Sequence, residues 1–157
     1  MTQGPGGGQD DLPHDLAHLV VEAEFAILNG IFGQVDAGGA GMFHPEHVDA
    51  ERKARRRGAR LAREHSDEAL RSERLVYLCM RARNGQPVDE TVRSREPDVR
   101  LEDIDRVARR IDALGRQWRS LGVSEPMTLL WTALPARRGR KAHVSLEVVE
   151  PPIGRAR

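Results

Sequence analysis

The sequence predicts an α+β fold in which three or four helices are followed by a C-terminal β-hairpin. Apolar residues recur at three- and four-residue steps through much of the chain, as they do in amphipathic helices. Near the C-terminus, segments 127–134 and 143–149 are rich in apolar and β-branched residues, and the charged segment 135–141 (PARRGRK) between them indicates a turn. A two-stranded hairpin is only marginally stable alone, so it should pack against the helices.

The 157 residues fit one domain, which is expected to span residues 11–150. Residues 1–10 are rich in glycine and lack apolar periodicity, so they are predicted to form a disordered tail. Residues 151–157 are expected to be a flexible basic tail.

The first helix is expected at residues 13–29. Pro13 suits a first helical turn because it has no amide proton to leave unpaired, and Asn29-Gly30 provides a stop. Segment 30–43 then carries five glycines and isolated apolar residues. It is interpreted as an irregular connection that is either ordered or mobile, and it could form a lid.

The second helical region opens at Pro45 and ends at Asn84-Gly85. Ser66 is a candidate N-cap within it, so the region is either one bent helix or two.

Residues 86–100 are polar and flanked by prolines, which predicts a loop. From 101 to 121 the apolar residues recur regularly and Gly122 follows, so this segment is the clearest helix of the chain.

Composition excludes several function classes. The formal net charge of +1 provides no global attraction to nucleic acid or to an anionic membrane, and nucleic-acid binding is not expected. Cys79 is the single cysteine, which excludes an intrachain disulfide and a multi-thiolate metal site, and it is expected to be buried. The N-terminus lacks a basic segment and an apolar run, and no stretch is apolar enough to cross a bilayer, so a cytoplasmic location is expected.

Polar side chains share one face of the expected first helix. His14, Asp15, His18 and Glu22 fall within an arc of about 100°, opposite an apolar arc. Histidines four residues apart can both reach one cation, since a helical turn rises about 5.4 Å and zinc–nitrogen bonds are about 2.0 Å. The polar face is therefore either an exposed edge or the wall of a cleft. Glu24 instead points into the apolar arc, where pairing with an arginine is expected.

Residues His14 to His18, with the sequence HDLAH, resemble the H-E-x-x-H helix of zinc metallopeptidases. In that family the histidines ligate zinc and the glutamate is the general base. The resemblance therefore implies that His14 and His18 are ligands and that Asp15 takes the base position. The longer segment 12–33, LPHDLAHLVVE followed by GIFG, is similar to short bacterial proteins of unknown function with a P-H-D-x-x-H-x-x-V-E motif, a resemblance that implies no activity.

Further metal ligands must come from outside the first helix. His44 and His47, in the segment FHPEH, are candidates, and segment 64–68 (EHSDE) offers another histidine and three carboxylates. Either segment could approach the first helix in the fold.

Three functional interpretations remain open. One is a cytoplasmic divalent-metal site, with zinc as the metal, in which a catalytic version would hydrolyse a substrate and Asp15 or Glu22 would accept the proton of a metal-bound water. An alternative is a non-catalytic interaction module whose arginine-rich helix, around Arg56 and Arg60, or whose basic hairpin tip contacts an acidic partner. The third is that the histidines and acidic residues are ordinary solvated side chains, and the sequence alone favours this one.

Overall fold

The structure is a computed structural model that describes residues 12–39, 48–121, 127–135 and 142–149. The predicted tails, residues 1–10 and 151–157, lie outside these ranges. The described residues form α1 (His14–Glu24), α2 (Ile31–Asp36), α3 (Val48–Glu64), α4 (Ser66–Arg83), α5 (Glu90–Arg93), α6 (Leu101–Ser120), β1 (Thr128–Leu134) and β2 (His143–Val149). The predicted α+β fold with a C-terminal hairpin is confirmed. No helix of the described ranges is long and apolar enough to cross a membrane.

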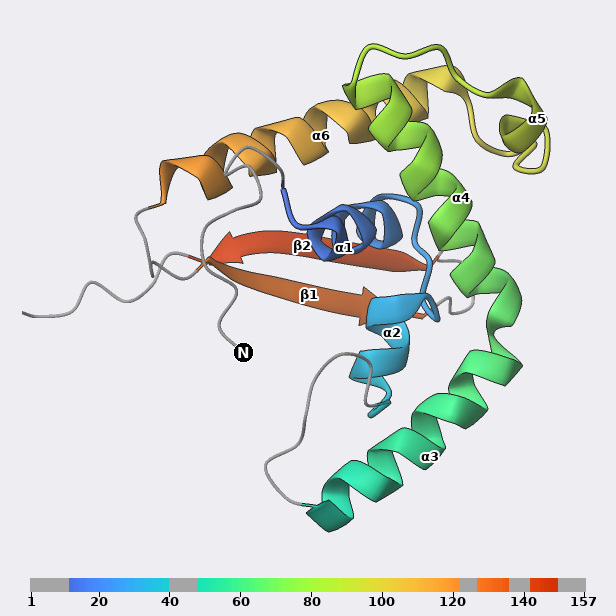
Figure 1. Ribbon diagram of the computed structural model, residues 1–157, viewed down its shortest axis with the longest axis vertical. Coiled ribbons are helices and arrows are strands. Elements are labelled where there is room, and N and C mark those ends of the chain that lie inside the picture. Colours follow the sequence, from blue (N-terminus) through green and yellow to red (C-terminus); the bar gives the residue numbers. More distant parts are fainter. Residues whose placement is uncertain (1–11, 40–47, 122–126, 136–141, 150–157) are drawn as a thin grey trace, which may run out of the picture.

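Helix α1 lies at the centre of the fold. It packs against α4, α6 and β2, while α3 contacts α2 and α4 and extends away from the other elements (Figure 1). The hydrophobic core forms where these central elements meet, because each of them buries branched side chains there. Fully or nearly fully buried members include Val20, Val21, Leu75, Leu78, Ile104, Ile111, Val144 and Leu146.

Helix α1 is shorter than predicted: it ends at Glu24 and not at residue 29. The chain leaves the helix through Ala26, whose φ of 52° is in the left-handed region. The amide of Ile27 then donates to the carbonyl of Glu22 at 2.9 Å and closes the turn. The Asn29-Gly30 pair therefore precedes a new helix, α2, and does not end the first one.

The glycine-rich connection contains a helix that the sequence analysis did not predict. Six residues, Ile31–Asp36, form α2, with Gly30 at its N-cap. A glycine inside so short a helix lowers its intrinsic propensity, so the tertiary contacts described below must hold it.

The arginine-rich region consists of two helices, which resolves the open question of one bent helix or two. Helix α3 ends at Glu64 and α4 starts at Ser66, with His65 between them. Helix α4 ends before Asn84-Gly85 as predicted, and Gly85 has a φ of 67° that suits glycine.

The segment predicted as a loop, 86–100, contains the short helix α5. Asp89 caps it by accepting hydrogen bonds from the amides of Thr91 and Val92, at 3.0 and 3.2 Å. Helix α6, at Leu101–Ser120, matches its prediction to within one residue.

The hairpin covers one side of the helical core, as expected. Trp131 pairs with Leu146 and Ala133 pairs with Val144 across the antiparallel strands. These residues belong to or pack against the core, whereas Leu130 on the alternate face is exposed. The alternation matches the two-residue period of a strand with one buried face.

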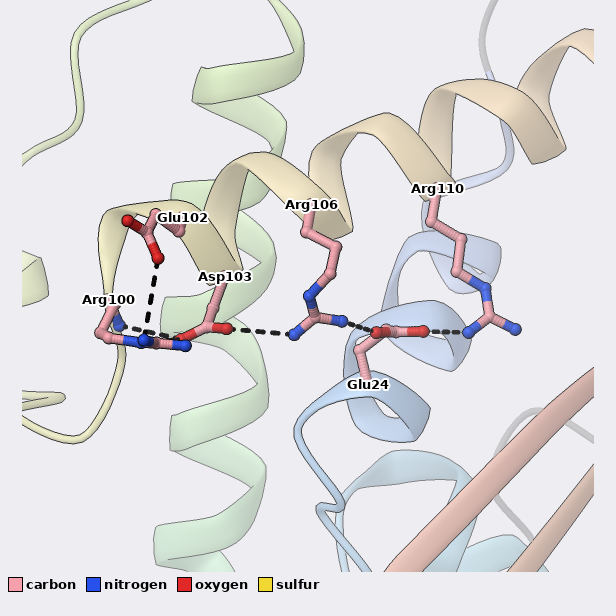
Figure 2. Close-up of polar contacts among 6 residues, drawn as sticks. All are labelled: Glu24, Arg100, Glu102, Asp103, Arg106 and Arg110. Atoms are coloured by element: carbon pink, nitrogen blue, oxygen red, sulfur yellow. Dashed lines mark hydrogen bonds and ion pairs between the residues drawn. The ribbon is translucent and has the colours of Figure 1, made fainter.

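Glu24 joins the C-terminal end of α1 to α6 and confirms the expected pairing with arginine. Its carboxylate accepts hydrogen bonds from Arg106 and Arg110, and Arg106 also contacts Asp103 (Figure 2). Arg110 donates in addition to the carbonyl of Leu146 in β2 at 2.7 Å. The Glu24 side chain is 10% exposed, while the side chains of Arg106 and Arg110 are 49% and 44% exposed.

We expect Glu24→Ala to lower the free energy of unfolding by about 1–2 kcal/mol. The value lies between those of exposed and buried ion pairs, because water can solvate the two released arginines. Urea unfolding would measure it, with Glu90→Ala as the control because the Glu90–Arg93 pair of α5 is exposed. Equal effects of the two substitutions would show that Glu24 contributes no more than a surface pair.

Candidate metal centre

Two histidines of α1 and one glutamate of α4 converge where these helices pack together. His14 is the first residue of α1, and His18 follows one turn later on the same face. Glu73 is in the second turn of α4. His14 is exposed and the Glu73 side chain is 58% exposed, whereas the His18 side chain is only 2% exposed. The group therefore lies at the surface but is anchored by one buried imidazole.

The separations between the side-chain atoms suit a single cation. The Nε2 atoms of His14 and His18 are 3.3 Å apart, and Oε2 of Glu73 is 3.5 Å from Nε2 of His18. One ligand atom from each of the three residues lies within 4.8 Å of the others. With zinc–nitrogen bonds of about 2.0–2.1 Å, neighbouring corners of a tetrahedron lie about 3.3 Å apart. The two imidazoles already have this spacing, and the carboxylate oxygen of Glu73 lies only slightly farther from His18.

Burial keeps His18 in the form that binds metal. Desolvation lowers the pKa of His18 below its usual value, the nearby Glu73 carboxylate opposes this shift, and His14 adds to it. A neutral imidazole offers an unprotonated nitrogen as a ligand. The geometry and the protonation state therefore favour the same chemistry.

Glu22 is fully buried and lies behind the histidines rather than beside their Nε2 atoms. Its Oε1 accepts hydrogen bonds from the amide of Ile31 at 2.7 Å and from the Ser72 hydroxyl at 2.9 Å, and its Oε2 accepts one from the amide of Phe32 at 2.9 Å. Burial raises the pKa of Glu22, and these donors oppose the rise. The carboxylate satisfies the first amides of α2, which explains how that short helix is held.

Glycine is required where α2 begins. A Cβ atom at Gly30 would lie 2.4 Å from both Cδ and Oε1 of Glu22, and a Cβ at Gly33 would lie 1.8 Å from the carbonyl oxygen of Leu28. The segment GIFG can therefore adopt this turn only because Gly30 leaves room for the Glu22 carboxylate and Gly33 leaves room for the Leu28 carbonyl. The histidine helix and the glycine turn that follows it form one continuous structure.

A chain of hydrogen bonds links this turn to the histidines. Nδ1 of His18 lies 3.0 Å from Oγ of Ser72, whose hydroxyl donates to Glu22. Ser72 and Glu22 are fully buried, and His18 is nearly so. This series of contacts runs from Glu22 to Ser72, then to His18, and finally to the surface residues His14 and Glu73.

The remaining sequence candidates are placed as follows. Asp15 is exposed on α1 next to His14, and its charge raises the pKa of His18 slightly against the effect of burial. Glu22 is separated from the ligand atoms by Ser72, and both of its oxygens already accept hydrogen bonds. His44 and His47 lie outside the described residues.

The segment 64–68 does approach the end of the first helical region, but not at the histidines. Glu68 accepts hydrogen bonds from the backbone amide and the side-chain amide of Asn29, at 3.0 and 2.7 Å, and lies 3.7 Å from His65. These contacts fix the connection between α1 and α2. Among the described residues, His14, His18 and Glu73 are the only group of three or more side chains placed to share a metal.

Sequence analysis missed Glu73 and Ser72. Glu73 carries no local signal, because an exposed glutamate on a polar helix is ordinary. Ser72 does carry one, since it precedes Leu75, Val76 and Cys79 by three, four and seven residues and therefore lies on the buried stripe of α4. A polar residue on such a stripe needs a buried partner.

Other candidate sites have different surroundings. Burial raises the pKa of the Cys79 thiol to about 12, which leaves it protonated and unreactive at neutral pH. On α3, four cationic side chains line an open depression of about 410 Å³: Lys53, Arg56, Arg57 and Arg60. Arg60 lies 3.7 Å from Glu64, in a pair that is about half exposed.

The chain was compared with protein-family models, with curated proteins and with solved structures, and no match was found. The interpretation of the cluster therefore rests on its own geometry.

Proposed function

We propose that this protein binds a divalent metal ion, zinc in particular, through His14, His18 and Glu73. The observation that carries the proposal is the 3.3 Å separation of the two Nε2 atoms, with the Glu73 carboxylate 3.5 Å from one of them. Of the ligands expected from the sequence, the two histidines are retained, and Glu73 takes the place of the ligand that had to come from another helix.

The ligand types and their exposure support an open site. Two imidazoles and one carboxylate form the protein ligand set of many catalytic zinc sites, in which water or substrate fills the fourth position. His14 and Glu73 are exposed, so an ion held here would be accessible from solvent. Closed structural zinc sites use four protein ligands, which makes a structural role less consistent with this group.

The catalytic version of the proposal is metal-assisted hydrolysis. A bound zinc ion would lower the pKa of its water toward neutrality. Asp15 is the better of the two predicted proton acceptors, because it is exposed and its charge acts on His18, while both oxygens of Glu22 are already hydrogen bonded. Asp15→Asn should therefore reduce hydrolysis while leaving zinc affinity almost unchanged.

The test compares zinc binding by Glu73→Gln with that by the unaltered protein. We expect near-stoichiometric zinc in the unaltered protein, purified without a histidine tag, by elemental analysis and calorimetric titration. Glu73→Gln removes a charged ligand at an exposed position and should weaken zinc binding by more than about 100-fold. Loss of a residue that only hydrogen bonds to a metal ligand usually has a smaller effect on metal affinity.

Glu64→Gln is the matched control, because Glu64 is 52% exposed and lies on α3, away from the histidines. It should bind zinc like the unaltered protein. The proposal fails if the unaltered protein takes up no zinc at neutral pH, or if both glutamine variants bind it equally well.

A further inference from the structure

We infer that Ser72 and Glu22 are positioning residues that hold His18 in the tautomer with its proton on Nδ1 and present the lone pair of Nε2 to the metal position. The part of this inference that concerns metal rests on the proposed function. The part that concerns the tautomer applies to the metal-free protein and can be tested separately.

The count of hydrogen atoms at Ser72 determines the direction of the contact with His18. A serine hydroxyl has one proton, and Ser72 donates it to Oε1 of Glu22 at 2.9 Å. Toward Nδ1 of His18, 3.0 Å away, Oγ can then act only as an acceptor. Nδ1 must therefore carry the proton, which leaves Nε2 of the neutral ring without one.

The surroundings of Glu22 fix the direction of the Ser72 hydroxyl. The amides of Ile31 and Phe32 point at Oε1 and Oε2 respectively, so each carboxylate oxygen already accepts a hydrogen bond from the start of α2. With donors on both oxygens, the carboxyl group serves as an acceptor toward Ser72 as well. The backbone of α2 therefore orients Glu22, Glu22 orients the Ser72 hydroxyl, and Ser72 orients the His18 ring.

Burial makes the alternative tautomer unfavourable. Glu22 and Ser72 have no exposed surface and His18 has 2%, so bulk solvent does not reach the contacts between them. With the proton on Nε2, the lone pairs of Nδ1 and of Ser72 Oγ would face each other in this buried position.

The outward-facing nitrogen lies where the proposed site needs a ligand. Nε2 of His18 is 3.3 Å from Nε2 of His14 and 3.5 Å from Oε2 of Glu73. Without metal, the His14 N–H can donate to the lone pair of His18, and with metal both imidazole nitrogens can bind the ion. Partners of this kind orient metal-binding histidines and make them stronger ligands.

The experiment reads the tautomer of His18 directly. Long-range ¹H–¹⁵N correlation spectra of the ¹⁵N-labelled, metal-free protein distinguish a protonated ring nitrogen from an unprotonated one. At neutral pH we expect His18 to have a protonated Nδ1 and an unprotonated Nε2. In Ser72→Ala this preference should be lost, while Ser72→Thr, which keeps the hydroxyl, should restore it. Ser94→Ala removes an exposed hydroxyl of the α5 region and should leave His18 unchanged.

Zinc titration of the same variants tests the consequence for binding. Ser72→Ala should weaken zinc binding about 10- to 100-fold, the effect usually seen when the partner of a metal-binding histidine is removed. Ser72→Thr should recover most of this loss, and Ser94→Ala should show none.

A proton on Nε2 in the unaltered protein would overturn the inference, even if Ser72→Ala fails to fold. An unchanged tautomer or an unchanged zinc affinity in folded Ser72→Ala would also overturn it. If the unaltered protein binds no zinc, the proposed function fails, and the tautomer spectra still decide whether Ser72 and Glu22 orient His18.

Discussion

Glu22→Ala is expected to lower the free energy of unfolding by about 3–5 kcal/mol, because it leaves one buried hydroxyl and two partly buried amides without an acceptor. The Glu22 carboxylate accepts hydrogen bonds from the amides of Ile31 and Phe32 and from the hydroxyl of Ser72. Each buried donor that loses its partner costs roughly 1–3 kcal/mol. Urea unfolding followed by circular dichroism would measure the loss, and exchange of the Ile31 and Phe32 amides with deuterium should accelerate at the same time.

The control is His14→Ala, in the same helix but exposed. It should change stability by no more than about 0.5 kcal/mol. If Glu22→Ala were as mild as this control, the buried carboxylate would not be the group that holds α2 in place.

The stability difference between the unaltered protein and Glu22→Gln should also depend on pH. Burial raises the pKa of Glu22 in the folded state above its unfolded value of about 4.5. The folded state therefore binds more protons, so the contribution of Glu22 to stability is greatest below pH 4.5 and is lost as the pH rises through the folded pKa. Glutamine does not titrate, so the difference between the two proteins should narrow over this window, by at most about 1.4 kcal/mol per pH unit. A difference that widened as the pH rose would contradict the direction of this shift.

Elements with a strong local pattern could be predicted from the sequence. Helix α6 has a regular apolar spacing over 20 residues, and the two strands are rich in apolar and β-branched residues on either side of a charged segment. The pairing of Glu24 with arginine could be predicted because Glu24 is an acidic residue on the apolar side of its helix, where an unpaired carboxylate would be costly. In each of these cases the information lies within one segment of the chain.

Helix α2 could not be predicted, because what stabilises it comes from another element. Its first amides are satisfied by Glu22, nine and ten residues earlier in the chain. One of the glycines that suggested a loop, Gly30, lies where the chain passes close to that carboxylate. Sequence periodicity does not report such a contact.

The candidate site was predicted in part for the same reason. The spacing of His14 and His18 placed them on one helical face, which is a local property. The same reasoning put Glu22 on a polar face, yet Glu22 is buried and contacts Ser72, 50 residues away in sequence, while His14 on the same face is exposed. Glu73 enters the site only because α1 and α4 pack together, so its part depends on the tertiary fold.

Zinc is expected to raise the free energy of unfolding by about 2.7 kcal/mol when free zinc is present at 100 times its dissociation constant. The metal would bind the folded arrangement of His14, His18 and Glu73, because their ligand atoms come from two helices that only the fold brings together. For a chain of this size the gain corresponds to a rise of about 5–10 °C in Tm. Differential scanning calorimetry with zinc, and then with a chelator, would measure it.

His14→Ala separates this gain from the stability of the fold itself. His14 is exposed, so the variant should unfold in the chelator at nearly the same temperature as the unaltered protein, yet gain little from zinc. His65→Ala is the control, because His65 lies near Glu68 and not at the proposed site. This variant should keep the full zinc-dependent rise in Tm. A zinc-dependent rise that survives in His14→Ala would place the ion elsewhere on the protein. Zinc competes with protons for the imidazole nitrogens, so a rise caused by this site should also shrink as the pH falls.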